Sequence, residues 1–456
     1  MSFPAYEEYK DSGVEWLEKV PEHWVVDRFK RSTVSCRNGI WGSEAQGDEN
    51  DIKCVRVADF DRESLTTCDD IPTTRNVTES ERAERTLSQG NLLLEKSGGG
   101  ALQPVGFVVL YDSFEPAVCS NFVAKVELAD GMNPSYWRYC HAAAYSIRLN
   151  YRSIKQTTGI QNLDQSQYLD ERAPFPPLPE QTAIASFLDS ETSKIDSLVD
   201  EQRRLIELLK EKRQAVISHA VTKGLDPNAP MKESSIEWLG EVPEGWTVTK
   251  LGFLSSKIGS GKTPRGGSET YVDEGVLFVR SQNVYDEGLR LEDVVFISNE
   301  VDEEMAISRV ENGDILLNIT GASLGRTCLV PEDSPSSNVN QHVCIIRLED
   351  PEQREFVAMV MKASVTKSQI DAAQNGAARE GLNFERIRQL RLAVPPRVEQ
   401  QAIVSLIDSE TSKIDAMATL AERAIELLQE RRTALISAAV TGKIDVRNHS
   451  SALSMN

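Results

Sequence analysis

The octapeptide DSETSKID occupies residues 189–196 and occurs again at residues 408–415, 219 residues later. The surrounding composition is ordinary, with 40% hydrophobic and 26% charged residues, so chance does not explain the identity. Internal repeats reveal how a chain is organised. The sequence on either side of the octapeptide therefore indicates how far the duplication extends.

The duplication covers nearly the whole chain, at offsets between 219 and 224 residues. The matching segments are VEWLEKVPEHW (14–24) with IEWLGEVPEGW (236–246), VRVADF (55–60) with VRSQNV (279–284), GNLLLEKSGGG (90–100) with GDILLNITGAS (313–323), PPLPEQTAIASFLDSETSKIDSLV (176–199) with PPRVEQQAIVSLIDSETSKIDAMA (395–418), and HAVTKGLD (219–226) with AAVTGKID (438–445). This period is far too long for a solenoid repeat. The chain therefore contains two copies of one pair of domains.

The nearly identical part of each copy has the pattern of a long helix. No Gly or Pro occurs between residues 180 and 221, and Pro176-Pro177 and Pro395-Pro396 mark where the two helices start. Apolar residues recur at alternating spacings of three and four: Ile184, Leu188, Ile195, Leu198, Leu205, Leu209 and Val216, with Ile403, Ile407, Ile414, Met417, Ala424, Leu428 and Leu435 at the equivalent positions. This pattern predicts two helices of about 40 residues, each about 60 Å long.

An apolar stripe on a long helix needs a partner. Matching stripes within one chain favour pairing of the two helices with each other; two separate dimerisation coils are the alternative. The expected fold is α+β, with two mixed globules, each followed by a long helix. The helices pair as an antiparallel coiled coil with internal pseudo-twofold symmetry. The octapeptide's outward face is then available twice to a partner protein, through Asp189, Glu191, Lys194 and Asp196 and through Asp408, Glu410, Lys413 and Asp415.

The two remaining segments, 28–175 and 247–394, agree only at scattered positions. They mix strand-like runs (106–111, 314–319) with helical stretches (135–148, 354–370), which is typical of α+β globules. The predicted domains are a first globular domain with its N-terminal leading segment (1–175), a first helical region (176–226), a second globular domain (227–394) with its own leading segment (231–246), a second helical region (395–445) and a C-terminal tail (446–456).

The sequence predicts no catalytic or metal site. SKIGSGKT (256–263) resembles a phosphate-binding loop, but Ser256 stands where that motif requires Gly. NPSY (133–136) resembles the motif of amino-methyltransferases, but Ser135 breaks it, and a helix start is expected there instead. The five histidines have no metal-ligand spacing. The seven cysteines form no CxxC pair and are expected to be free or buried thiols of a reducing cytoplasm.

Polar loops after apolar strands are the candidate binding elements. Asn, Gln, Arg and Lys on loops are the usual readers of base edges and phosphates, although ordinary turns have a similar composition. The candidate DNA-binding residues are Asn38, Trp41, Arg56, Ser97, Gly98, Gly99, Thr157, Gln161 and Asn162 in the first copy, and Lys262, Thr263, Arg265, Arg280, Gln282, Asn283, Thr320, Ser323, Arg326, Arg379 and Asn383 in the second.

Bulk charge argues against strong DNA binding by the chain alone. The net charge is −20, with 17 basic and 20 acidic residues in 28–175 and 16 basic and 22 acidic residues in 247–394. A DNA-binding module normally carries a basic surface that neutralises phosphates. We therefore expect a partner to supply much of the phosphate contact. No apolar run approaches a membrane helix and no signal peptide is evident, so the expected location is cytoplasmic.

With its duplicated EWLxxVPxxW motifs and its duplicated PPxxEQ…DSETSKID segments, the chain resembles the specificity subunits of type I restriction-modification systems. The resemblance implies that the globules are target-recognition domains, each reading one half of a bipartite DNA site, and that the helices set the spacing. It further implies that two modification subunits dock on the helical regions and that restriction subunits can join them. The chain itself would be non-catalytic and bind no cofactor; S-adenosylmethionine, ATP and Mg²⁺ are expected on the partners.

Two other functions fit parts of the sequence. The first is a self-contained DNA adenine methyltransferase, which the broken NPSY motif and the absence of a Gly-rich cofactor loop disfavour. The second is a coiled-coil scaffold that reads no DNA.

Overall fold

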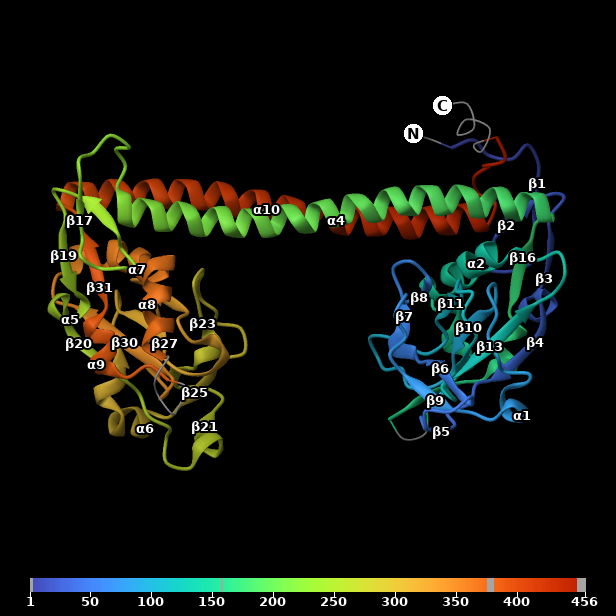
Figure 1. Cartoon of the computed structure of the whole chain (residues 1–456), viewed down its shortest axis with the longest axis horizontal. Helices are drawn as coiled ribbons and strands as arrows, with labels where there is room; N and C mark the ends of the chain where they lie inside the picture. The colour runs from blue at the N-terminus through green and yellow to red at the C-terminus, as the bar shows by residue number, and fades with distance from the viewer. Residues whose placement is uncertain (1–2, 157–158, 375–380, 449–456) are drawn as a thin grey trace. The chain divides into compact units, whose positions relative to one another are not determined.

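The computed structural model describes residues 3–156, 159–374 and 381–448. The chain divides into two compact units. The first unit comprises Met1–Arg203 with Arg423–Asn456, and the second unit comprises Arg204–Glu422. Two long helices, green and red in Figure 1, each contribute one half to each unit.

The long helices are α4 (Leu178–Lys223, 46 residues) and α10 (Arg397–Val440, 44 residues). At 1.5 Å per residue they span about 69 and 66 Å. Both are slightly longer than predicted. The predicted stripe is buried at most positions toward the helix ends, but Leu198 and Met417 are 44% and 49% exposed. Val199 and Ala421 are buried instead, because a helix of 3.6 residues per turn drifts away from a strict heptad repeat.

The prediction that the two helices pack antiparallel is confirmed within each unit. In the first unit, Ile184 and Leu188 from the start of α4 share a core with Leu435 and Ala439 from the end of α10. In the second unit, Ile217 and Val221 from the end of α4 share a core with Ile403 and Ile407 from the start of α10.

One ion pair between the helices is duplicated. Arg432 Nε lies 3.1 Å from Asp196 Oδ1 in the first unit, and Arg213 Nε lies 3.2 Å from Asp415 Oδ1 in the second. Each partner lies 219 residues from its equivalent, so the two pairs occupy corresponding positions of the repeat. Burial raises the pKa of Asp196 even though Arg432 lowers it. Desolvation thus offsets the attraction, and we infer that this pair contributes more to helix register than to stability.

Two sheets form the globular part of the first unit. The strands of the larger sheet lie in the order β4 (Thr33–Asn38), β13 (Val123–Leu128), β10 (Leu92–Glu95), β11 (Val108–Leu110), β8 (Thr66–Thr67), β7 (Phe60–Asp61). Those of the smaller lie in the order β12 (Ala117–Cys119), β6 (Asp51–Val55), β9 (Thr74–Asn76), β5 (Ser43–Glu44). The remaining elements are β1 (Tyr9–Asp11) paired with β2 (Lys19–Pro21), β3 (Val25–Arg28) paired with β16 (Arg172–Phe175), β14 (Ile154–Gln156) paired with β15 (Gln161–Leu163), α1 (Glu79–Arg82), α2 (Pro134–Ser146) and α3 (Gln165–Leu169).

The second unit repeats this plan. Its first sheet has the order β20 (Ser255–Ser260), β30 (Val343–Leu348), β27 (Ile315–Asn318), β28 (Thr327–Leu329), which matches β4, β13, β10, β11. Its second sheet has the order β21 (Tyr271–Val272), β25 (Val295–Ile297), β22 (Val276–Val279), β29 (Ser337–Val339), β26 (Arg309–Val310). The remaining elements are β17 (Met231–Glu233) paired with β18 (Glu241–Pro243), β19 (Thr247–Lys250) paired with β31 (Arg391–Val394), β23 (Val284–Tyr285) paired with β24 (Gly288–Leu289), α5 (Leu251–Leu254), α6 (Asn299–Glu304), α7 (Arg354–Lys362), α8 (Ser364–Gln374) and α9 (Phe384–Gln389).

The leading segment, one helix start and one helix end meet at a single junction in the first unit. The indole N–H of Trp24, which is fully buried, donates to Glu180 Oε2 at 2.9 Å, and the Tyr6 hydroxyl donates to the same oxygen at 3.2 Å. Gly442, just past the end of α10, has φ +74°, and a Cβ there would lie 2.4 Å from Pro21 Cδ. The leading segment therefore packs on the start of α4 and the end of α10 together.

The second unit has the same junction with the helices exchanged. The Trp246 indole N–H donates to Glu399 Oε2 at 3.1 Å in the first turn of α10. Gly224, just past α4, has φ +76°, and a Cβ there would lie 3.3 Å from Trp246 Cζ2. Three segments, EWLxxVPxxW, PPxxEQ and the Val-Thr pair at 221–222 and 440–441, build this junction in each unit. Each of the three is therefore similar between the two copies of the repeat.

Several local predictions can be compared with the structure. Asn133 caps α2 by accepting the Tyr136 N–H at 3.0 Å, so NPSY starts a helix as predicted. Residues 256–260 belong to β20, which pairs with β30. The seven cysteines are free thiols. Among the described residues, no helix is long and apolar enough to span a membrane.

The helical stretch predicted over 354–370 is helical except at Ala363, which divides it into α7 and α8. The chain is extended at Ala363 (φ −68°, ψ 150°), between α7 and α8. Two side chains of α4 bind at the break: Gln214 Nε2 donates to the Lys362 carbonyl at 2.9 Å, and Ser218 Oγ accepts the Ser364 N–H at 2.9 Å. A contact with a distant segment thus ends a helix that local propensity would continue.

The packing of the junction predicts that Gly442→Ala lowers the free energy of unfolding more than Gly131→Ala does. Gly442 and Gly131 both have positive φ (+74° and +82°), but nothing lies within 4 Å of a Cβ at Gly131. We expect Gly131→Ala to cost about 1 kcal/mol from backbone strain alone. Gly442→Ala should cost about 1–3 kcal/mol more, because the new methyl overlaps Pro21. Denaturant unfolding of both variants measures this; equal losses would contradict the junction's tight packing.

The C-terminal residues predict a pH-dependent contribution to stability. Asp445 donates its backbone N–H to the Pro4 carbonyl at 2.7 Å, and Arg447 Nη2 lies 2.6 Å from Asp445 Oδ2. The Arg447 hydrogen bond lowers the pKa of Asp445. A carboxyl whose folded pKa is depressed stabilises the fold above its unfolded pKa, about 3.9 for Asp, and loses this contribution as pH falls through the folded pKa.

Arg447→Ala should therefore reduce the unfolding free energy at pH 6 and flatten its decline between pH 5 and pH 3. Urea unfolding across this range provides the measurement. Arg152→Ala removes an exposed ion pair with Glu15 in the same unit and serves as the control, with the wild-type pH profile expected. A wild-type profile for Arg447→Ala would refute the contribution.

Candidate nucleic-acid interface

Three of the predicted loops come together in the first unit. Ser97 Oγ donates to Asn162 Oδ1 at 2.5 Å, and the Gly98 N–H donates to the Gln161 carbonyl at 3.1 Å. The Lys96 ammonium donates to the side-chain oxygen of Asn38. The ends of β4, β10 and β15 thus bring together residues far apart in the sequence.

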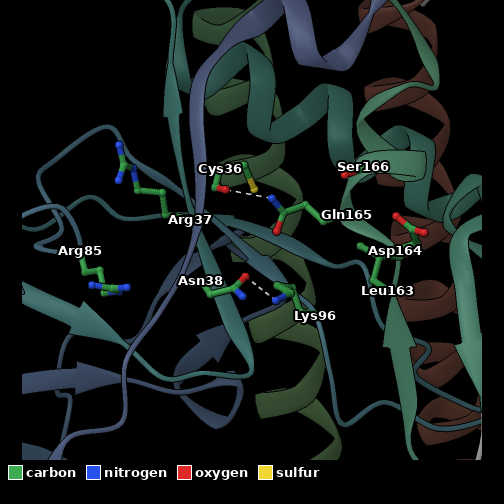
Figure 2. A pocket seen from close by; sticks show the side chains of 9 residues that line it. All are labelled: Cys36, Arg37, Asn38, Arg85, Lys96, Leu163, Asp164, Gln165 and Ser166. Carbon is green, nitrogen blue, oxygen red and sulfur yellow. Dashed lines mark hydrogen bonds between the residues drawn. The ribbon is translucent and has the colours of Figure 1, made fainter. Parts of the chain in front are cut away.

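These strand ends border a polar cleft (Figure 2). It is lined by Cys36, Arg37, Asn38, Arg85, Lys96, Leu163, Asp164, Gln165 and Ser166. Of these nine residues, only Asn38 was a candidate from the sequence. Arg37 and Lys96 directly precede the predicted loop residues Asn38 and Ser97, so extending each loop by one residue would have found them. Arg85 lies in a segment without a loop signal and could be found only from the fold.

The cleft carries more positive than negative charge. Asp164 is its one acidic residue, and Lys155 Nζ lies 2.6 Å from Asp164 Oδ2. The hydrogen bond from Lys155 lowers the pKa of Asp164, which stays ionised and compensated. Arg37 forms an ion pair with Glu84, whereas Arg85 donates to the backbone carbonyl of Glu81 at 2.9 Å and forms no ion pair with any residue that the structure describes. Together with the Lys96 ammonium, Arg85 makes the cleft suitable for a phosphate.

The Cys36 thiol of the cleft is not activated as a nucleophile. Burial raises the pKa of the Cys36 thiol to about 12, although Lys96 lowers it. The thiol therefore stays protonated near neutral pH. Gln165 Nε2 donates to the Cys36 carbonyl at 2.9 Å, and this hydrogen bond holds the Gln165 side chain against β4 in the lining of the cleft. Among the described residues, no group of three or more His, Cys, Asp and Glu side chains could hold a metal ion.

The predicted correspondence between loops of the two copies is confirmed by matching backbone hydrogen bonds. Lys96 N–H donates to the Phe122 carbonyl at 2.8 Å, and Ile319 N–H donates to the His342 carbonyl at 3.0 Å. Leu163 N–H then donates to Lys96 at 2.8 Å, as Leu382 N–H does to Ile319 at 2.9 Å. The loops that begin at Ser97 and Thr320 are therefore built alike but carry different side chains.

Some candidates of the second unit shape its loops. Asn283 is 1% exposed, and its amide is bonded to the Arg280 N–H and the Arg290 carbonyl. Gln282 Nε2 donates to Asp293 Oδ2 at 2.8 Å, and Arg280 Nη2 donates to the Asp293 carbonyl at 2.8 Å. Burial thus keeps Asn283 from a ligand, whereas Gln282 is exposed.

The other candidates of this unit lie at or near the surface. Lys262 and Thr263 are exposed, as is Arg265, and Lys262 Nζ donates to the Glu304 carbonyl at 3.0 Å. Thr320 Oγ1 lies 2.6 Å from His342 Nδ1. The remaining three have structural contacts: Ser323 Oγ accepts from Asn318 at 3.1 Å, Arg326 lies 4.6 Å over the Tyr285 ring, and Asn383 caps α9.

In the first unit, Trp41 is 40% exposed and Arg56 is bound to Asp59, with Nη2 3.1 Å from Oδ1. Gly99 is half-buried where its backbone passes close to Val105. Thr157 and Arg379 lie outside the described residues.

The octapeptide is only partly a free surface. Asp189 accepts from Arg138 and from the Tyr139 hydroxyl, the latter at 2.8 Å, and Asp196 and Asp415 form the duplicated pair between the helices. Lys194 and Lys413 are exposed and pair with Glu191 and Glu410 at 2.5 and 2.6 Å, one helical turn away. No side-chain bond of Asp408 occurs among the contacts that the described residues make. The exposed polar surface common to both copies therefore centres on these two Glu–Lys pairs.

Comparisons with known proteins agree on one class. A family model described as the type I restriction modification DNA specificity domain matches residues 243–425. The chain is 25% identical over 341 residues to the type I restriction enzyme EcoBI specificity subunit of Escherichia coli, covering 72% of this chain and 70% of that one. It is 20% identical over 450 residues to the EcoKI specificity subunit of Escherichia coli strain K12, covering 93% and 90%.

Two solved structures share the fold. The HsdS subunit of Thermoanaerobacter tengcongensis is 14% identical with a TM-score of 0.52, covering 93% of this chain and 98% of that one. A chain from a structure described as "Structural basis underlying complex assembly and conformational transition of the type I R-M system" is 14% identical with a TM-score of 0.69, covering 92% and 98%.

The cleft predicts which cations contact phosphates. We expect Lys96→Ala and Arg85→Ala each to lower the slope of log K against log salt by about 1 on duplex DNA of mixed sequence, because each removes one phosphate contact. Lys19→Ala, an exposed lysine on β2 of the same unit, is the matched control and should leave the slope unchanged. Fluorescence anisotropy titrations at several salt concentrations measure the slopes. Identical slopes for Lys96→Ala and Lys19→Ala would exclude a phosphate role for Lys96.

Proposed function

We propose that the chain is a specificity subunit of a type I restriction-modification system and that it reads a bipartite DNA sequence, one half-site for each unit. It acts in this proposal as the non-catalytic recognition component of a methylating and restricting complex. The globular parts contact the DNA, and the paired helices connect them.

One observation carries the proposal: the two units share a backbone plan but differ in the side chains that their equivalent loops present. Lys96 of the first unit is replaced by Ile319 of the second, and Phe122 by His342, although the backbone hydrogen bonds at these positions match. A scaffold without a reading function has no reason to keep the loops and vary only what they present. Two domains that read two different half-sites need the same loop backbone and different side chains on it.

The helical regions support docking of a partner used twice. Lys194 and Lys413, with their Glu partners, are equivalent in the two copies and exposed in both. Two modification subunits, one for each copy, would find the same chemistry in the same local setting. S-adenosylmethionine, ATP and Mg²⁺ would be bound by partner subunits, and restriction subunits would join the same complex.

The partner subunits also explain how a chain with an excess of acidic residues could bind DNA. The chain carries 50 basic against 70 acidic residues, and the cationic cleft of the first unit is a local exception. The proposal therefore requires modification subunits to close around the duplex and supply much of the phosphate contact. Weak binding of mixed-sequence DNA by the chain alone is expected at moderate salt.

The alternative of a self-contained methyltransferase has no supporting site. The side chain of Asn133, the first residue of the broken motif, accepts the Tyr136 N–H and donates to Thr182 Oγ1 at 3.3 Å. It serves to cap α2 and to hold that helix near the start of α4.

Mapping of N6-methyladenine in host DNA, with and without this gene, tests the proposal. A bipartite methylated motif should disappear on deletion and return on complementation. Complementation with Ser97→Ala should relax one half of the motif, and His342→Ala should relax the other half, because each side chain lies in the loop cluster of a different unit. A motif that is continuous, or that survives deletion, would overturn the proposal.

A further inference from the structure

Beside the cationic cleft, the first unit has a second hollow with aromatic walls. We propose that this hollow binds a single DNA base that has left the duplex stack, between Trp41 and Phe122. The inference rests on the proposed function and deepens it, because it names what one part of the DNA-reading face takes up.

The hollow is mainly apolar. Its cavity of about 430 Å³ is lined by Trp41, Val57, Ala58 and Phe122, with Arg56, Ser120 and Asn121 as polar members. Trp41 and Phe122 are 40% and 49% exposed, although both are large apolar side chains. Exposed aromatic residues grouped around one hollow are typical of binding sites.

Trp41 is held in place from one side. The Arg75 guanidinium lies 4.5 Å from the centre of the Trp41 ring, in a cation–π contact. The same guanidinium donates to the Trp41 carbonyl at 3.0 Å and to the Gly42 carbonyl at 3.3 Å. One face of the indole is thus covered while the residue stays exposed, and the side chain is ordered before any ligand arrives.

The loop that carries Trp41 has little freedom. A Cβ at Gly39 would lie 2.1 Å from the Cys119 carbonyl oxygen, and one at Gly42 (φ +63°) would lie 2.4 Å from the Asn76 carbonyl oxygen. Both glycines allow the loop to run directly against neighbouring backbone. The Trp41 platform therefore has a fixed position relative to the sheets below it.

The hollow and the cationic cleft are joined by backbone hydrogen bonds between residues that line them. The Phe122 carbonyl accepts the N–H groups of Lys96 and Ser97, at 2.8 and 3.3 Å. Lys96 lines the cleft and bonds to Asn38, three residues before Trp41. A DNA strand whose phosphates lie against Lys96 would pass its bases beside the two aromatic rings.

An unstacked base matches this chemistry better than the other groups that DNA offers. Arg56, Ser120 and Asn121 can donate hydrogen bonds, but the mainly apolar walls would leave most of a phosphate's acceptor oxygens without a partner. The thymine methyl, the one apolar group of the major groove, would fill only a small part of the space. A base out of the stack exposes two flat π-faces, which stack on aromatic side chains. The Arg56 guanidinium, held by Asp59 at 3.1 Å, is one polar group available to its edge, and Ser120 and Asn121 are others.

The second unit lacks this platform. Gly261 takes the place of Gly39 against the Val339 carbonyl, so its loop begins in the same way. Two residues further on, Thr263 replaces Trp41, and His342 replaces Phe122. Ile297 stands on β25 where Arg75 stands on β9, because Ile297 pairs with Val276 of β22 and Arg75 pairs with the equivalent residue Ile52 of β6. The aromatic hollow is therefore assigned to the half-site that the first unit reads.

The test uses the full chain assembled with its modification subunits, and duplexes that carry the mapped bipartite motif. At each position of the first unit's half-site, the recognised base is kept and its partner base on the other strand is replaced by a mismatch. Unpairing lowers the cost of removing a base from the stack, so a base that leaves the stack binds more tightly when mismatched.

We expect one position at which the mismatch raises affinity by about tenfold or more in the wild type. Trp41→Ala and Phe122→Ala should abolish this gain and weaken binding of the matched duplex by roughly 5- to 150-fold, the effect of about 1–3 kcal/mol per stacked base. Trp41→Phe keeps an aromatic face and should retain most of the gain. Phe114→Ala, an 87% exposed aromatic of the same unit away from the hollow, should behave as wild type.

Two results would overturn the inference while leaving the proposed function intact: sequence-specific binding with no mismatch gain in this half-site, or a gain that survives both Trp41→Ala and Phe122→Ala. The latter would assign the unstacked base to a modification subunit, since methyltransferases extrude their own target base. Absence of any bipartite motif would instead refute the proposed function, before this experiment begins.

Discussion

A helix of 46 residues with one apolar stripe cannot remain alone in water, and the rest of this structure depends on how that stripe is covered. The chain covers it with a second helix of the same pattern, running in the opposite direction within each unit. Antiparallel pairing brings the start of one helix beside the end of the other. Each unit therefore receives one helix start and one helix end, although α4 belongs to the first copy of the repeat and α10 to the second.

The junctions follow from this pairing. In each unit a buried Trp of the leading segment donates to a Glu in the first turn of one helix, and a glycine past the end of the other helix packs against the same leading segment. The following Gln in each PPxxEQ segment donates back to a proline carbonyl just before the helix, at 2.9 Å in both copies. Segments that are distant in sequence thus have to change together, which accounts for their similarity between the copies.

Away from the junctions, the constraints on side chains differ. The sheets must keep their strand order, but the loops at the ends of β4, β10 and β15 have only to preserve a few backbone hydrogen bonds. Side chains such as Lys96 and Phe122 can therefore change to Ile319 and His342 without loss of the loop structure. An acidic chain can therefore present a cationic cleft, because the fold has only to bring three basic side chains, Arg37, Arg85 and Lys96, close together.

Residue pattern alone determined the duplication, the two long helices and their starting points, since each depends on neighbours along the chain. It also identified the Asn133 helix cap and the loops that correspond between copies. Tertiary structure decided which polar groups remain available. Asp189 is bound by Arg138, 51 residues away, Asn283 is buried by its own turn, and Arg85 joins a cleft with no loop signal near it. Periodicity reports which face of a helix is apolar, but the partner of a polar side chain depends on contacts between distant segments, and only the folded chain brings those together.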